Sequence, residues 1–148
     1  MSLNLFRSLH QSNDPLLLAN VWDTHSAQLA EEVGCKAIGT SSHAISNSLG
    51  LEDGNNLSID ELLFFVKRIV KAVNIPVSVD IESGYAHEPS AIAQNIKTLA
   101  NLGVVGINLE DSILVNGKRT LVDANEFTNK LRSIVHILNE HNVAMFMN

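Results

Sequence analysis

Short apolar segments recur along the chain and alternate with stretches that have helical spacing. Five of these segments are nearly continuous in valine, isoleucine and leucine: Leu16–Asn20, Lys36–Thr40, Pro76–Ile81, Val104–Leu109 and Val143–Met147. Strands of a parallel sheet that is covered on both faces have this character, whereas an antiparallel sheet with one wet face would show a cleaner alternation. The pattern therefore predicts five parallel strands.

Amphipathic segments precede and separate these strands, and their ends carry helix signals. The predicted helices are Leu3–His10, Thr24–Val33, Ser58–Val73, Ser90–Leu102 and Asp123–Asn142. Asp23 is placed to cap the second helix, Ser58 and Glu61 have capping-box spacing, and Gly103 ends the fourth helix. A short N-terminal helix followed by alternating strands and helices indicates an α/β fold. Pattern alone leaves open a doubly wound sheet and a TIM-type (β/α)₈ barrel.

Composition narrows the class of protein. The chain has 148 residues, 45% of them hydrophobic, which is enough for one globular domain over residues 1–148. The net charge is −6, and Lys118-Arg119 is the only basic cluster, so nucleic acid is not an expected partner. No apolar run approaches the ~20 residues of a membrane span. A single cysteine, Cys35, excludes an intrachain disulfide and fits a cytoplasmic location.

Two acids directly follow the third predicted strand. Asp80 and Glu82 alternate with Ile81, so strand geometry would point both carboxylates the same way. Gly84 follows and gives the chain freedom to turn. Carboxylates at the carboxyl end of a parallel strand are ligands suited to a hard cation such as Mg²⁺.

The fourth predicted strand ends in the same way, with Asn108 and Glu110 on one face. Neighbouring strands would bring Glu110 close to Asp80 and Glu82, and three like charges repel strongly unless a cation lies between them. An acid at one strand end can simply cap the next helix or face water. The repetition on two successive strands favours a metal site made by Asp80, Glu82 and Glu110.

Two loops offer further candidates. Small polar residues, Ser41 and Ser42, follow the second strand and would give an anion access to backbone N–H groups, although an ordinary polar loop has the same composition. His43 could act as a base or be structural. The stretch from Leu49 to Asn56 is long for a loop of this kind and contains Asp53, but Asp-Gly is also a common turn dipeptide.

Together these segments resemble the phosphoenolpyruvate mutase/isocitrate lyase superfamily, in its mutase-like branch. The matching residues occur in the family's order, one set at each strand end: Asn20-Val21-Trp22-Asp23, Thr40-Ser41-Ser42, Gly50 with Asp53-Gly54, Asp80 to Tyr85, and Gly106 to Asp111. The resemblance implies a (β/α)₈ barrel, of which this chain would hold about five strands and four helices after the short N-terminal helix. It also implies a homo-oligomer for the complete protein.

The resemblance implies an enzyme that makes or breaks a C–C or P–C bond next to a 2-oxo acid, a Mg²⁺-dependent lyase or a phosphonomutase-like isomerase. Its substrate would be a small 2-oxo acid or phosphonate, and its intermediate an enolate. Mg²⁺ would be held by Asp80 directly, with Glu82 and Glu110 acting largely through water. Asp53, Asp80 and Glu110 would be the catalytic residues.

The resemblance also implies that Ser41, Ser42 and His43 line the pocket for the 2-oxo acid. Asn116 and Lys118, in the loop after the fourth strand, would serve as substrate-closing residues. Two departures matter. The loop Asp111–Thr120 lacks the cysteine and histidine of the lyase branch, and the chain stops after its fifth predicted strand. These departures keep open a catalytically inactive barrel fragment or a dicarboxylate-binding protein.

Overall fold

The computed structural model describes residues 3–52 and 57–148 and has one main sheet. Its five strands are all parallel and correspond to the five predicted ones: β1 (Leu18–Val21), β2 (Ala37–Thr40), β3 (Val77–Asp80), β4 (Gly106–Asn108) and β7 (Phe146–Met147). They lie side by side in the order β1-β2-β3-β4-β7. The five-strand prediction is confirmed.

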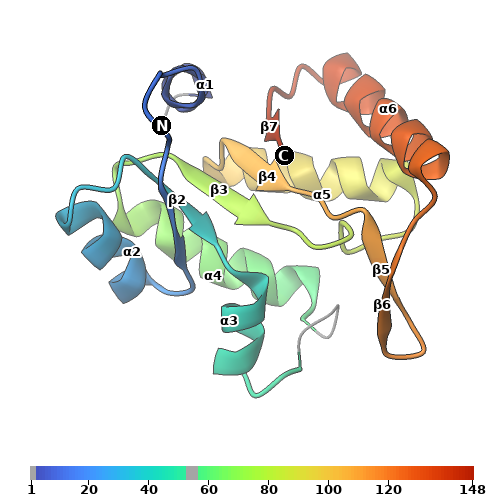
Figure 1. Ribbon diagram of the computed structural model, residues 1–148, viewed down its shortest axis with the longest axis horizontal. Helices are drawn as coiled ribbons and strands as arrows, with labels where there is room; N and C mark the ends of the chain where they lie inside the picture. The colour runs from blue at the N-terminus through green and yellow to red at the C-terminus, as the bar shows by residue number, and fades with distance from the viewer. Residues whose placement is uncertain (1–2, 53–56) are drawn as a thin grey trace.

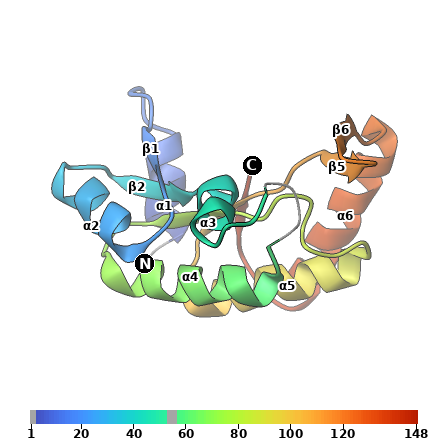
Figure 2. The same ribbon diagram turned by 90° about the horizontal axis from the view of Figure 1, so that it is seen from below.

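Helices cover this sheet and connect its strands. They are α1 (Leu3–His10), α2 (Thr24–Glu32), α3 (Ser42–Ser48), α4 (Ile59–Ala72), α5 (Pro89–Leu102) and α6 (Ala124–Glu140). Helix α2 packs against α4, α4 against α5, and α5 against α6, so the crossover helices form one continuous layer. Figure 2 shows α4 and α5 running side by side beneath the strands.

The strand order decides between the two architectures that the pattern left open. In a doubly wound sheet the strand order reverses at a switch point, and helices lie on both faces. Here each strand pairs with the next strand of the main sheet, and the crossover helices follow one another around one side. This is the arrangement of a (β/α) barrel seen over part of its circumference.

The core lies between the strands and the helix layer. Ile38, Val79 and Ile107 on neighbouring strands are fully buried, as are Val66 of α4 and Ile96 of α5. These side chains belong to one continuous cluster. It fixes the strands and thereby the positions of the residues that follow their carboxyl ends.

Helix α1 packs at the other end of the strands through Phe6, which is 1% exposed. Phe6 contacts the ring of Phe146 with the ring centroids 5.3 Å apart. A Cβ atom at Gly106 would lie 2.7 Å from Cε1 of Phe6, so the backbone of β4 approaches this ring closely. Helix α1 therefore lies away from the end of the sheet where α3 lies (Figure 1).

One helix and one two-stranded hairpin were not predicted, and each follows the end of a strand. Helix α3 begins immediately after β2, where a polar loop was expected. The segment after β4, also expected to be a loop, forms an antiparallel hairpin of β5 (Ser112–Val115) and β6 (Lys118–Leu121). Its turn is Asn116-Gly117, with φ of 52° and 73°. Asn-Gly is the preferred dipeptide of two-residue turns with two positive φ angles, so the signal was present in the sequence.

Within the two described ranges, no helix is both long and apolar enough to cross a membrane.

Candidate active site

Polar residues gather where β2, β3 and β4 end. Asp80 is the last residue of β3 and pairs in register with Asn108 of β4. Beyond the strands the two backbones stay joined, because the N–H of Glu110 donates to the carbonyl oxygen of Glu82 at 2.7 Å. The structure thus brings the backbones of the three predicted acids together.

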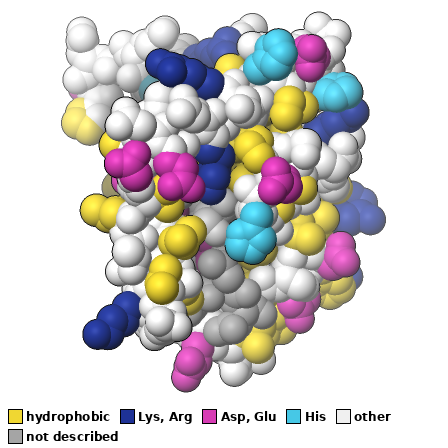
Figure 3. Space-filling model, turned by 90° about the vertical axis from the view of Figure 1, so that its right-hand side faces the viewer, with side chains coloured by type: hydrophobic (Ala, Val, Ile, Leu, Met, Phe, Trp, Pro, Cys, Tyr) yellow, Lys and Arg dark blue, Asp and Glu magenta, His cyan; other side chains and the backbone are white. Residues whose placement is uncertain are grey.

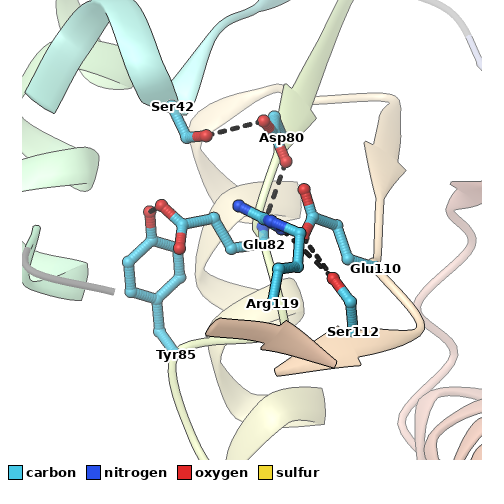
Figure 4. Close-up of polar contacts among 7 residues, drawn as sticks. All are labelled: Ser42, Asp80, Glu82, Tyr85, Glu110, Ser112 and Arg119. Carbon is cyan, nitrogen blue, oxygen red and sulfur yellow. Dashed lines mark hydrogen bonds and ion pairs between the residues drawn. The ribbon is translucent and has the colours of Figure 1, made fainter. Parts of the chain in front are cut away.

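Asp80 is held by donors from two neighbouring segments (Figure 4). The hydroxyl of Ser42, on α3, donates to Oδ2 of Asp80 at 2.7 Å. The backbone N–H of Glu82 donates to Oδ1 at 3.1 Å, and the N–H of Asp80 itself donates to Oγ1 of Thr40 at 3.0 Å. Both carboxylate oxygens are therefore oriented by the protein.

Glu82 occupies a backbone conformation that few side chains adopt. Its φ is +47°, and Gly84 and Tyr85 nearby have φ of +105° and +56°. Because β3 ends at Asp80, the strand alternation used to place Glu82 beside Asp80 does not extend to it. Glu82 is 2% exposed and accepts a 3.4 Å hydrogen bond from the hydroxyl of Tyr85 at Oε1. Its side chain turns toward Tyr85 (Figure 4).

Glu110 is paired with a cation that the sequence did not assign to the site. Its Oε2 forms an ion pair with Nη1 of Arg119, on β6, and accepts a 3.1 Å hydrogen bond from the Ser112 hydroxyl. The same Nη1 donates to the oxygen of Ser112 at 3.1 Å. Arg119 is part of the basic pair noted in the sequence, but only the hairpin brings it back to the strand end.

A cleft opens beside this pair. Its volume is about 710 Å³, and Glu110, Ser112 and Arg119 line it together with Phe127 of α6. Figure 3 views the molecule from the side of the hairpin and α6. On that face, acidic, basic and apolar side chains alternate, without a large field of one sign. The cleft is wide enough for a small organic acid and offers it both charged and apolar walls.

The remaining predicted residues have different surroundings. Ser41 is the N-cap of α3, and its hydroxyl accepts from the N–H of Ala44 at 3.2 Å. His43 is exposed, with Nε2 at 2.9 Å from Nδ2 of Asn47. Asn116 lies in the hairpin turn. Asp53 lies outside the described residues. Among the predicted binding residues, Ser42 donates its hydroxyl to an acid of the site.

The donor set can be compared with the needs of Mg²⁺. Among the residues that the structure describes, no group of three acidic, histidine or cysteine side chains lies close enough to hold a metal ion. The chemistry of the donors nevertheless fits, since Asp80, Glu82 and Glu110 are all hard oxygen ligands. The guanidinium of Arg119 on Glu110 shows that a positive charge is stable at this strand end. Metal binding by these three acids stays a prediction.

Comparisons with known proteins bear on the fold as a whole. The family model described as phosphoenolpyruvate phosphomutase matches residues 6–148. A relative in Mycobacterium tuberculosis (strain ATCC 25618 / H37Rv), itself an uncharacterised protein, is 39% identical over 107 residues, which are 72% of this chain and 40% of that protein.

Solved structures agree with this match. A protein assigned as a phosphonomutase from Burkholderia cenocepacia J2315 superposes with a TM-score of 0.89 at 34% identity, covering 99% of this chain and 58% of that one. A 2,3-dimethylmalate lyase of the PEP mutase/isocitrate lyase superfamily superposes with a TM-score of 0.83 at 21% identity, covering 98% and 51%. The chain therefore spans about half the length of these relatives. Because the family match covers nearly all of it, the chain belongs to the phosphoenolpyruvate phosphomutase family, within the PEP mutase/isocitrate lyase superfamily, and represents the N-terminal part of that fold.

Proposed function

We propose that the protein to which this chain belongs is a Mg²⁺-dependent enzyme that makes or breaks a C–C or P–C bond next to a 2-oxo acid, through an enolate. One observation carries the proposal. Three carboxylates lie at or just beyond the ends of two paired strands. The first of them, Asp80, has both oxygens oriented by hydrogen bonds from Ser42 and from the Glu82 backbone. A carboxylate that only interacts with water does not require hydrogen bonds that fix its orientation.

Asp80, Glu82 and Glu110 are the residues that would hold the metal. When bound, Mg²⁺ supplies Lewis-acid stabilisation of the negative charge that develops on the 2-oxygen. Ser42 keeps the Asp80 carboxylate in one orientation. The Tyr85 hydroxyl donates to Oε1 of the buried Glu82 and helps to orient that carboxylate.

The substrate would be a small 2-oxo acid or a phosphonate, bound next to these acids. Ser42 is the first helical residue of α3, so its backbone N–H has no acceptor within the helix and can serve an anionic oxygen. Ser41 and His43 flank it in the same segment. Asn116, in the hairpin turn, and Asp53, outside the described residues, are further parts of this proposal. In this proposal the segment from Ser41 to His43 binds the carboxylate of the substrate.

The choice between C–C and P–C chemistry stays open within this proposal. The relatives include a protein assigned as a phosphonomutase and a 2,3-dimethylmalate lyase. The hairpin, residues 112–121, contains neither cysteine nor histidine, so an acid or base of those types would have to come from another segment. A single barrel domain that includes residues 1–148, a homo-oligomer and a cytoplasmic location are likewise parts of the prediction.

The test is turnover of a panel of 2-oxo acids and phosphonates with Mg²⁺, followed by ¹H and ³¹P NMR. Asp80→Asn should abolish product formation, because it removes one carboxylate charge while keeping the side-chain shape. Asp60→Asn, on the exposed face of α4, is the matched control and should leave turnover unchanged. Full turnover by Asp80→Asn would reject the assignment. Saturable oxalate binding without any product would favour a dicarboxylate-binding protein instead.

A further inference from the structure

Arg119 connects the β5–β6 hairpin to the acids of the candidate active site. The hairpin is a separate two-stranded sheet and forms no ladder with the main sheet. All four residues of β6 are exposed, and in β5 only Ser112 is buried. The bonds from Arg119 to Glu110 and Ser112 are therefore among the described contacts that hold this hairpin against the strand end.

The guanidinium of Arg119 forms an ion pair with Glu110, a carboxylate that we propose as a metal ligand. Nη1 pairs with Oε2 of Glu110, and the Ser112 hydroxyl donates to that same oxygen. A guanidinium carries a positive charge, as a divalent cation does. A divalent cation close to Glu110 would repel this charge and would compete with it for the carboxylate. Binding of a divalent cation to Glu110 should therefore weaken the ion pair between Glu110 and Arg119.

We propose that Arg119 is an internal counter-cation that competes with the divalent metal for Glu110, so that metal binding releases the hairpin from the strand end. This inference rests on the proposed metal site. It assigns a role to Arg119 beyond the three acids: with no metal bound, the arginine neutralises Glu110, and metal binding frees the guanidinium at the wall of the cleft, where it can meet an anionic substrate.

Lys118 provides a matched control on the same strand. It precedes Arg119 directly, carries the same charge, and points to the opposite face of β6 because strand side chains alternate. Removing either charge makes the site region more negative and favours any cation by a long-range effect. Only the removal of the Arg119 charge also removes the ion pair with Glu110. The difference between Arg119→Gln and Lys118→Gln therefore isolates the local competition.

The experiment measures Mn²⁺ affinity by electron paramagnetic resonance in the wild type and in both variants. The pair is partly exposed, at 44% for Arg119 and 32% for Glu110, so its contribution is that of a surface ion pair. We expect Arg119→Gln to bind Mn²⁺ roughly two- to fivefold more tightly than Lys118→Gln. We also expect Mn²⁺ to accelerate hydrogen exchange of residues 112–121 in the wild type, and to have no such effect in Arg119→Gln, where the contact is already absent.

The outcomes separate this inference from the proposed function. Equal Mn²⁺ affinity in the two variants, or weaker binding by Arg119→Gln, would overturn the competition while the metal site stands. Unchanged hairpin exchange in the wild type at saturating Mn²⁺ would overturn the release of the hairpin. Absence of Mn²⁺ binding in all three proteins would overturn the metal site itself and the competition with it.

Discussion

Ser42 Oγ lies 2.7 Å from Oδ2 of Asp80, so residues 38 positions apart in the chain share one hydrogen bond at the end of the sheet. The bond joins the first turn of α3 to the last residue of β3. A short aspartate side chain has few rotamers, and a donor on a neighbouring element selects one of them. The orientation of the acid that we place at the centre of the site thus depends on a helix that follows a different strand.

Ser42→Ala should destabilise the protein more than Ser46→Ala. Both serines are buried on α3, but the Ser46 hydroxyl has no hydrogen-bond partner among the described residues. Losing the bond to a carboxylate should lower the free energy of unfolding by about 1–2 kcal/mol, whereas Ser46→Ala should change it by less than about 0.5 kcal/mol or raise it. Urea unfolding of the two variants measures the difference. Equal losses would show that the Ser42–Asp80 bond adds nothing to stability.

Gly84→Ala should be more harmful than Gly117→Ala, although both glycines have positive φ angles, +105° and +73°. A Cβ atom at Gly84 would lie 2.9 Å from two side-chain carbons of Ile92, while one at Gly117 would meet no atom within 4 Å. We expect about 1 kcal/mol of backbone strain at Gly117, and about 2–4 kcal/mol at Gly84, where overpacking adds to it. Thermal unfolding provides the comparison. Similar decreases in the unfolding temperature of both variants would mean that the Ile92 side chain can move aside without loss of stability.

Asp23→Ala should lower stability at neutral pH and lose this effect in acid. Asp23 caps α2, and hydrogen bonds from the backbone N–H and hydroxyl of Ser26 hold the pKa of its carboxyl below the usual value. A depressed folded-state pKa gives a stabilisation that is complete above the unfolded pKa of about 4 and disappears as the pH falls through the folded value.

The cost of Asp23→Ala should therefore be about 1 kcal/mol near pH 7 and should shrink below about pH 4. Urea unfolding at a series of pH values measures this dependence. Asp23→Asn is the control, because an asparagine can cap the helix and does not titrate. A cost that is the same at pH 7 and pH 2.5 would contradict the lowered pKa of Asp23, because an uncharged side chain would then cap the helix equally well.

Mg²⁺ should stabilise the protein if the three acids bind it. At a free concentration of about ten times the dissociation constant, the free energy of unfolding should rise by about 1.4 kcal/mol. Asp80→Asn should abolish this increase and Asp60→Asn should retain it. Differential scanning fluorimetry with and without Mg²⁺ detects the change. A Mg²⁺ effect of equal size in Asp80→Asn would place the ion elsewhere.

The main elements could be predicted because their signals are local. Continuous apolar character marked the strands, and caps such as Asp23 and Ser58 marked the helices to within a residue or two. The first strand was predicted as Leu16–Asn20 and is found at Leu18–Val21, since only the latter residues pair with β2. Helix α3 was not predicted, because a seven-residue helix shows too little periodicity to be distinguished from a polar loop.

The site was predicted in part, for a related reason. The strand ends that carry Asp80, Glu82 and Glu110 lie side by side, because adjacent parallel strands bring their ends to one edge. The expected cluster of their three carboxylates is not formed by the described side chains. The direction of Glu82 depends on a positive φ, and the position of Arg119 depends on how a hairpin folds back. The Asn116-Gly117 dipeptide signals the hairpin, but the contact of Arg119 with Glu110 depends on where the hairpin lies relative to the strand end.

The backbone at Glu82 also has a consequence for attempts to engineer this protein. A residue other than glycine with φ of +47° carries strain on the order of 1 kcal/mol, and a glycine there would relieve it. A screen for thermal tolerance alone would therefore tend to replace this carboxylate. With Glu82 holding a metal, as we propose, selection for heat resistance and selection for turnover would favour different residues at this position.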